Sequence, residues 1–193
     1  MTKFIFAFFF LGLIPTLSYG QDKKSHKWEV WGRVFRYDLN GDGLLEGLQA
    51  VKKDRQDWFY VRDHNNHVLF KGRLQTVGRA SRVYRIKINR IGPDLKLLGL
   101  YFYDGFSHGD EFYGTSSLYF LTFKQSKLEN FKLTQGPSIS LEYETSYRYR
   151  RRRYKIKLED LNRNGIKEVV IYYNHIKRVF RYVPGKGMTN AVI

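Results

Sequence analysis

The chain has no cysteine, so it can form neither a disulfide nor a thiolate metal site. It also has no His-Glu-x-x-His and no Gly-x-Ser-x-Gly segment, which removes the familiar signatures of zinc hydrolases and serine hydrolases. No Asn-x-Ser/Thr sequon occurs, which is compatible with a bacterial exported protein. Oxygen-bearing and charged side chains are therefore the groups left to carry a function.

Proline and helical patterns are scarce as well. Only 4 Pro stand against 15 Tyr, 15 Phe and 3 Trp, and aromatic and β-branched residues alternate with charged ones in many short runs, as in strands. Outside residues 4–14, no window shows an apolar repeat at helical spacing, and Gly, Asn and Asp clusters recur at hairpin intervals. These patterns predict an all-β, antiparallel protein.

The N-terminus predicts export. Lys3 precedes an apolar run at residues 4–14, which Pro15 ends and Ser18 and Gly20 follow. This is the order of a secretory signal peptide, and the run is too short to span a bilayer. We therefore expect a signal peptide over residues 1–20 and a periplasmic, outer-surface or secreted protein, with a retained membrane anchor as the alternative.

Two nine-residue segments share one pattern of oxygen-bearing side chains. Residues 38–46 read Asp-Leu-Asn-Gly-Asp-Gly-Leu-Leu-Glu, and residues 160–168 read Asp-Leu-Asn-Arg-Asn-Gly-Ile-Lys-Glu. Oxygen donors occupy positions one, three, five and nine, and the glycine at position six permits a sharp turn. Because hard oxygen ligands without sulfur or histidine suit Ca²⁺ better than zinc or copper, we predict that calcium is the cofactor of both loops.

Other interpretations of these loops were weighed. Asn-Gly and Asp-Gly form hairpin turns without any ion, which remains the alternative. An EF-hand is excluded, because it requires a bidentate Glu at position twelve and flanking helices, whereas position twelve here is Gln49 or Ile171. His64 and His67 straddle a polar turn and form a weaker metal candidate.

A third copy of the loop hairpin lies between these two. Residues 84–103 align with residues 154–173 without a gap, and both begin with Tyr, a basic residue, Ile, Lys and an aliphatic residue. The ligand positions of the middle copy hold Arg90, Gly92, Asp94 and Leu98. This copy is therefore expected to keep the hairpin without binding an ion. Three repeat units are predicted in one domain over residues 21–183, followed by a flexible tail at 184–193.

A second pair of strands follows each loop hairpin. The expected strands are 58–62 with 68–74, 118–123 with 128–133, and 179–183 alone in the third unit. We expect the segment at 28–31 to supply the missing strand of the third unit and so close an exposed sheet edge. Val34 and Arg36 are out of phase with the aligned Ile156 and Leu158, which predicts either a bulge or a shifted strand in the first unit.

The loops between strands resemble the FG-GAP or VCBS calcium repeats of integrin-type β-propellers and bacterial secreted proteins. The resemblance covers three segments and implies that the side chains at positions one, three, five and nine and the carbonyl at position seven bind the ion. The implied ligands are Asp38, Asn40, Asp42, the Leu44 carbonyl and Glu46, and Asp160, Asn162, Asn164, the Ile166 carbonyl and Glu168. Because a closed propeller has about four to eight blades, three units predict a curled, incomplete propeller or several copies completing a ring.

Positive charge is the second strong feature. Removing Lys3 with the signal peptide leaves 33 of the 34 Lys and Arg residues against 18 Asp and Glu, a formal net charge of +15. The predicted anion-binding residues are Arg148, Arg150, Arg151, Arg152, Arg153, Lys155 and Lys157. If Tyr154, Ile156 and Leu158 face the core of a strand, Arg151, Arg153, Lys155 and Lys157 share the opposite face. The alternative is a solvated edge that discourages aggregation.

These features predict a calcium-stabilised binding module that recognises an anionic surface, a glycan or an envelope protein. Nucleic acid is not expected as a partner of an exported protein, and a homo-oligomer is possible. The alternative is an envelope-polymer hydrolase with carboxylates in the 104–111 loop, namely Asp104, Asp110 and Glu111.

Overall fold

The computed structural model describes residues 29–75, 81–108, 111–145, 148–151, 154–173 and 175–191. All regular structure in these residues is β-strand, and every strand pair is antiparallel. No helix in this part of the chain is long and apolar enough to cross a membrane. The predicted all-β, antiparallel fold is confirmed, whereas the predicted signal peptide lies outside the described residues.

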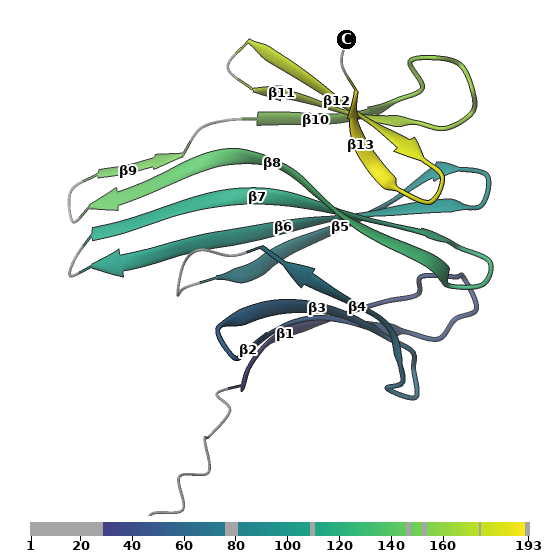
Figure 1. Ribbon diagram of the computed structural model, residues 1–193, viewed down its shortest axis with the longest axis horizontal. Coiled ribbons are helices and arrows are strands. Elements are labelled where there is room, and N and C mark those ends of the chain that lie inside the picture. Colours follow the sequence, from purple (N-terminus) through teal and green to yellow (C-terminus); the bar gives the residue numbers. More distant parts are fainter. Residues whose placement is uncertain are drawn as a thin grey trace, which may run out of the picture.

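The described residues form thirteen strands in three sheets, each with its strands in chain order (Figure 1). The first sheet comprises β1 (Glu29–Tyr37), β2 (Glu46–Lys53), β3 (Gln56–Arg62) and β4 (Val68–Leu74). The second comprises β5 (Arg82–Gly92), β6 (Leu95–His108), β7 (Glu111–Lys124), β8 (Glu129–Thr145) and β9 (Arg148–Arg151). The third comprises β10 (Tyr154–Glu159), β11 (Glu168–Tyr173), β12 (Ile176–Val183) and β13 (Gly187–Ala191).

Each sheet begins with one of the three aligned hairpins, so the three-unit organisation is confirmed. The two oxygen-rich loops join β1 to β2 and β10 to β11, and a tight turn at Pro93 and Asp94 joins β5 to β6. The bulge predicted in the first unit is also present, because the β1–β2 register shifts between Trp31 and Val34.

The end of the chain differs from its prediction. The tail expected at 184–193 is wrong for Gly187–Ala191, which form β13 and complete the third sheet. The turn into β13 uses glycines with positive φ at Gly185 and Gly187, and it directs Met188 into the core, where 2% of its surface is exposed. The segment near residue 28 does not fill this role, because β1 pairs with β2 in the first sheet.

The described part of the segment at 104–111 is strand rather than loop, and Gly109 and Asp110 lie outside the described residues. The strands β6 and β7 form one long hairpin, with pairs from Leu95 with Lys124 to His108 with Glu111. The aromatic residues of this hairpin suit strands, and Gly114 serves close packing. A Cβ at Gly114 would lie 1.7 Å from the Tyr103 hydroxyl, so only glycine fits there.

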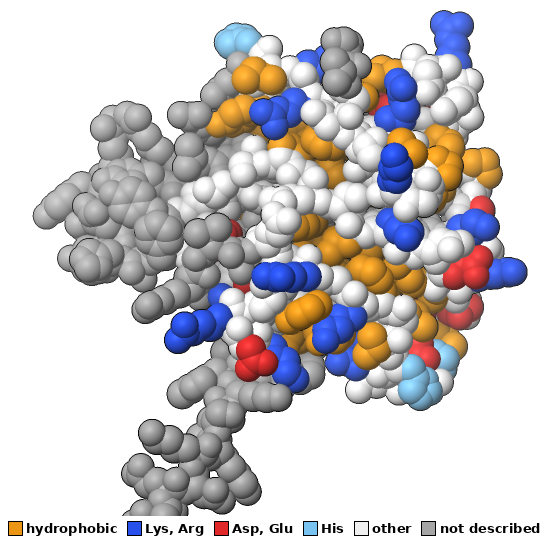
Figure 2. Space-filling model, viewed as in Figure 1, with side chains coloured by type: hydrophobic (Ala, Val, Ile, Leu, Met, Phe, Trp, Pro, Cys, Tyr) orange, Lys and Arg blue, Asp and Glu red, His pale blue; other side chains and the backbone are white. Residues whose placement is uncertain are grey.

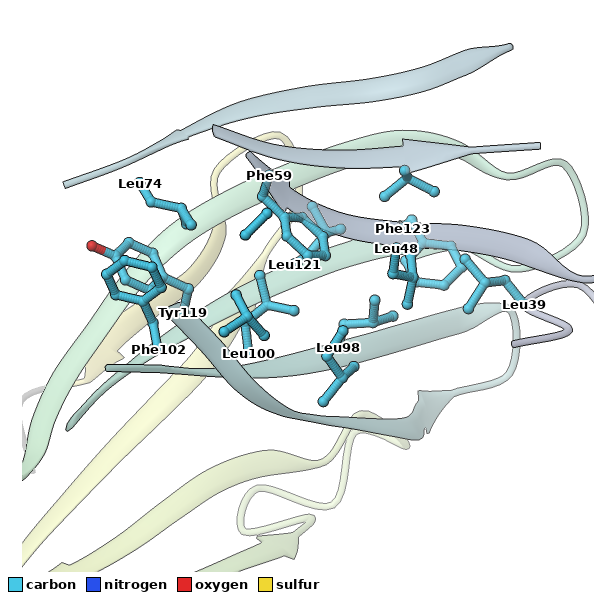
Figure 3. Packing of buried hydrophobic residues seen from close by; sticks show 14 residues of the cluster. Leu39, Leu48, Phe59, Leu74, Leu98, Leu100, Phe102, Tyr119, Leu121 and Phe123 are labelled. Carbon is cyan, nitrogen blue, oxygen red and sulfur yellow. The ribbon is translucent and has the colours of Figure 1, made fainter. Parts of the chain in front are cut away.

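The second sheet lies between the other two, as Figure 1 shows. One core packs the first sheet against the second, and Figure 3 shows Leu48 and Phe59 from the first sheet beside Leu100 and Leu121 from the second. Another core, which includes Leu118, Phe120, Ile171 and Phe180, packs the second sheet against the third. Burial of these apolar side chains is the main force that holds the layers together.

The three sheets stack with the same orientation, as the blades of a propeller do. Ile86 and the aligned Ile156 each face the preceding sheet, since Ile86 joins the core shared with the first sheet and Ile156 packs on the core shared with the second. Equivalent faces therefore point the same way along the stack. The outer faces of the first and third sheets are consequently the two open ends of an incomplete propeller.

Candidate calcium loops and basic faces

Backbone amides fix the oxygen side chains of the first loop. The Asp38 carboxylate accepts hydrogen bonds from the amides of Gly41 and Gly43, at 2.6 and 3.0 Å. The Asn40 Oδ1 accepts from the amide of Asp42 at 3.1 Å, and Asp42 Oδ1 accepts from the amide of Leu44 at 2.7 Å. The amides hold the oxygens at positions one, three and five within one tight loop.

Glu46 at position nine closes the same loop from its far end. Its Oε2 accepts a hydrogen bond from the amide of Leu39 at 2.7 Å, and the residue is 2% exposed. Burial raises the pKa of Glu46, and the negative charges of Asp42 and Asp38 raise it further. The charges of Asp42 and Asp38 thus disfavour the ionised form of Glu46, and a bound cation would offset that effect.

The second loop repeats this geometry. Asp160 accepts from the amides of Asn164 and Gly165 at 3.1 and 2.9 Å, and the amide of Leu161 donates to Glu168 at 2.8 Å. Asn162 and Asn164 accept at 3.2 and 2.8 Å from the amides two residues beyond each of them. Two segments far apart in sequence therefore fold into one conformation.

The two loops differ in charge. In the second loop, Arg181 Nε lies 3.3 Å from Glu168 Oε1, so an arginine already offsets one of its two carboxylates. In the first loop, none of Asp38, Asp42 and Glu46 forms an ion pair with a described residue. The first loop therefore carries the larger uncompensated negative charge.

The first loop fits a calcium ion better than the second. Its ligand set consists only of oxygen, with three carboxylates, one amide and the Leu44 carbonyl, which is the chemistry that Ca²⁺ prefers. Among the described residues, no three His, Asp or Glu side chains cluster closely enough to hold a metal by themselves. Binding would therefore depend on Asn40 and the carbonyl as much as on the carboxylates.

Both loops also connect the layers. Lys96 of the second sheet donates to the Leu39 carbonyl at 2.6 Å, and Gln125 donates to the Asn40 carbonyl at 3.2 Å. The amide of Lys167 in the second loop donates to the Ile91 carbonyl at 2.7 Å. An ion that ordered either loop would thereby strengthen contacts between sheets.

The burial of the apolar residues at positions two and seven shows on which side each loop contacts a neighbouring sheet. Leu39 is fully buried against the second sheet, whereas the equivalent Leu161 is 44% exposed. At position seven the order reverses, because Ile166 packs on the second core and Leu44 is 43% exposed. Each loop thus lacks the neighbour on one side that a longer stack would provide.

The middle hairpin uses its polar residues for structure. Asp94 accepts hydrogen bonds from the amide and the hydroxyl of Ser126, both at 2.8 Å. These bonds lower the pKa of Asp94 below its ordinary value. Arg90 donates through Nε to the Gly92 carbonyl at 3.0 Å. This turn is therefore tied to the β7–β8 turn beside it.

His67 of the β3–β4 turn contacts the carboxylate of Asp63. His67 Nδ1 lies 3.0 Å from Asp63 Oδ2, and the amide of His67 donates to Asp63 Oδ1 at 2.7 Å. The contact stabilises the turn between two strands.

The basic run divides between two sheets, so the prediction that Arg151 shares a strand face with Lys155 and Lys157 is wrong. Arg148–Arg151 form β9, which pairs with β8 in the second sheet, whereas Lys155 and Lys157 belong to β10 in the third. Within β10 the predicted alternation is confirmed, with both lysines exposed and Ile156 turned to the core. The side chains of Arg148, Arg150, Arg151, Arg152 and Arg153 lie outside the described residues.

A second cationic surface, which the sequence alone did not indicate, covers the outer side of the first sheet. Figure 2 shows Lys and Arg side chains spread over the three layers in that view. The outer-face residues of the first sheet include Arg36, Trp58, Tyr60, Arg62, Lys71 and Arg73. Cross-strand pairing brings them together from three strands, which no local motif reveals.

A cavity of about 310 Å³ lies between the first two sheets and is lined by Arg33, Lys52, Asp57 and Arg82, among others. The buried Asp57 accepts a hydrogen bond from Ser81 at 2.6 Å and lies 3.5 Å from the Lys52 ammonium. These bonds tie the start of β5 to the first sheet, which is a structural role for the carboxylate.

No family model, curated protein or solved structure matches the chain. The resemblance to FG-GAP and VCBS repeats therefore rests on the loops themselves.

Proposed function

We propose that the protein is an exported, calcium-stabilised binding module that recognises an anionic envelope surface or glycan. The observation that carries the proposal is the combination of a strong positive charge with cations turned outward from a rigid stack of sheets. Lys155 and Lys157 point away from the core on one end of the stack, and Arg62 and Lys71 do so on the other. Such faces attract polyanions, with a strength that falls as salt rises.

Calcium in this proposal has a structural role. Asp38, Asp42 and Glu46 would hold the ion, with Asn40 and the Leu44 carbonyl, and the ion would supply the positive charge that the first loop lacks. Since that loop contacts Lys96 and Gln125 of the second sheet, the ordered loop would stiffen the junction between two layers. The same roles in the second loop fall to Asp160, Asn162, Asn164, the Ile166 carbonyl and Glu168.

The binding proposal is tested by retention of the mature chain on a polyanion column, such as immobilised heparin, over a range of salt. We expect retention that declines steeply with salt, because exposed charges act over a Debye length of about 8 Å at physiological ionic strength. Flow-through at low salt, from a protein that still melts cooperatively, would show that the charge serves solubility only.

A hydrolase is the alternative; of the carboxylates proposed for it, Asp104 belongs to β6 and Glu111 to β7, whereas Asp110 lies outside the described residues. Replacing Asp104, Asp110 and Glu111 together with their amides distinguishes the two roles. If the protein is a binding module, the triple variant keeps its retention on the polyanion. If the protein is a hydrolase, the triple variant releases fewer soluble fragments from an envelope polymer than the unmodified protein does.

A further inference from the structure

The outer face of the first sheet carries a regular array of cations and aromatic rings. The opposite face of the same strands packs on the second sheet, and no other sheet of the described residues covers the outer face, where Arg36, Lys71 and Arg73 are exposed and Val51 is fully buried. Direct cross-strand neighbours form three rows on this face: Arg36, Gly47 and Arg62; Val34, Gln49, Tyr60 and Lys71; and Val51, Trp58 and Arg73. Cations thus alternate with rings and small or neutral residues.

The rings hold the cations in place. Lys71 Nζ lies 4.3 Å from the centre of the Trp58 ring and 5.7 Å from that of Tyr60. The Arg62 guanidinium carbon lies 5.1 Å from the Tyr60 ring centre. Cation–π contacts of this kind restrict long side chains before any ligand arrives, so less conformational entropy is lost on binding.

The array has a single sign. The described strand residues that face outward between Val34 and Arg73 include no acidic side chain, and Arg36, Arg62, Lys71 and Arg73 form no ion pair with a described residue. The outer face of the third sheet is different. There Lys157 pairs with Glu159 at 3.0 Å, and Arg181 pairs with Glu168 at 3.3 Å.

This contrast separates ligand binding from simple solubility. Mixed charges, as on the third sheet, are sufficient to keep the exposed face of a terminal sheet in contact with water. An unbalanced row of cations is unfavourable for the isolated protein because like charges repel, and an anion would relieve that repulsion. Guanidinium groups also bind carboxylate or sulfate through paired hydrogen bonds.

We propose that the outer face of the first sheet is the ligand site, and that its ligand is a linear anionic polysaccharide carrying carboxylate or sulfate groups. The inference rests on the proposed function and places its site on Arg36, Arg62, Lys71 and Arg73 rather than on the basic run near residue 150. The polymer lies across the strands, where Gly47 contributes no side chain between Arg36 and Arg62.

Two other occupants fit this face less well. A second copy stacked end to end would bring the outer face of its third sheet against these cations, and Lys155 and Lys177, which form no ion pair with a described residue on that face, would repel them. A bilayer would require aromatic side chains free to enter it, whereas Trp58 and Tyr60 are half-buried with Lys71 over both rings.

The test compares two charge-matched variants of the mature chain. One carries Arg62→Gln, Lys71→Gln and Arg73→Gln on the first sheet, and the other carries Lys127→Gln, Lys177→Gln and Lys186→Gln at exposed positions outside that sheet. The probes are polygalacturonate, heparin and vesicles of phosphatidylglycerol with phosphatidylcholine. We expect the first variant to bind one of the polysaccharides at least about tenfold more weakly, and the second to lie within about twofold of the unmodified protein.

A single-site pair guards against misfolding of the triple variant. A Cβ at Gly47 would meet its nearest atoms at 3.8 and 3.9 Å, which is ordinary contact, so Gly47→Ala should fold and bind normally. Gly47→Glu places a carboxylate between Arg36 and Arg62 and should weaken binding several-fold.

Each outcome decides the matter. Equal losses of affinity in the two triple variants would agree with a polyanion-binding function but would overturn the assignment of the site to this face. Binding of the unmodified protein to vesicles alone would overturn the assignment of a polysaccharide as the ligand. Self-association of the unmodified protein that the first triple variant abolishes would overturn it as well. Binding to none of the probes would overturn the proposed function together with this inference.

Discussion

Single residues determine whether the β6–β7 hairpin can pack. Gly114 lies beneath the ring of Tyr103, a residue that is 5% exposed and so has little room to move. Elsewhere in the same sheet the backbone is less crowded, since a Cβ at Gly99 would meet nothing closer than 3.9 Å. Gly114 is therefore required by the packing of Tyr103, whereas the backbone at Gly99 leaves room for a Cβ.

The Gly114→Ala variant should lose about 1–3 kcal/mol of unfolding free energy, because its Cβ would overlap the Tyr103 ring. The Gly99→Ala variant is the matched control and should change it by less than about 1 kcal/mol. Urea denaturation of both variants measures the difference. Equal stability of the two would contradict the close approach of Tyr103 to Gly114.

Asp94 gives the turn cluster a defined pH dependence. Its pKa is lowered from the ordinary 3.8, first by the hydrogen bond from the Ser126 amide and then by the one from the hydroxyl. A lowered folded-state pKa stabilises the protein above the unfolded-state pKa, and this contribution disappears as the pH falls through the folded-state value.

We therefore expect the Asp94→Asn variant to melt below the unmodified protein at pH 7. The gap should narrow as the pH falls below 3.8 and close once Asp94 is protonated in the folded state. Thermal melts between pH 7 and pH 2.5 measure this. A difference in melting temperature that stays constant with pH would mean that the charge of the Asp94 carboxylate contributes nothing to stability.

At the scale of elements, the two oxygen-rich loops are equal in geometry and unequal in surroundings. Both fold through the same amide-to-carboxylate bonds, but only the first inserts its position-two leucine into a neighbouring layer. Local sequence therefore determines the loop conformation, while the position of the loop in the stack determines how much it contributes to stability.

The matched pair Leu39→Ala and Leu161→Ala tests this difference. Leu39 is fully buried, so its truncation should cost about 2–5 kcal/mol of unfolding free energy. Leu161 is 44% exposed, so the same change there should cost less than about 0.5 kcal/mol. Similar losses in chemical denaturation would indicate that a further layer covers Leu161 in solution.

Sequence patterns predicted the hairpins better than the surfaces. The alternation in Tyr154, Ile156 and Leu158 and the phase break at Val34 each predicted the local structure correctly, because both depend on neighbours within one strand. The strand β13 was missed because it has little apolar character besides Met188 and gains stability only by pairing with β12. Tertiary pairing can override weak local preference in this way.

At the scale of the whole molecule, three layers leave two open ends with different chemistry. The third sheet ends in internally paired charges, whereas the first ends in unbalanced cations held by Trp58 and Tyr60. No local motif indicates this asymmetry, since the cations of the first sheet are scattered from residue 36 to residue 73. Only the register of four strands places them on one face.

The central claim is that calcium in the first loop stabilises this stack. A ligand that binds only the folded state stabilises it by about 3 kcal/mol at a hundredfold excess over its dissociation constant. The Asp38→Ala, Asp42→Ala variant should lose most of that gain. Asp54→Asn with Glu129→Gln removes two carboxylates outside the loops and serves as the charge-matched control.

The most direct measurement is the melting temperature of these three proteins in millimolar calcium and in chelator. We expect calcium to raise the melting temperature of the unmodified protein and the control by the same several degrees, and to leave the Asp38, Asp42 variant nearly unchanged. Equal melting of the unmodified protein in calcium and in chelator would contradict the account.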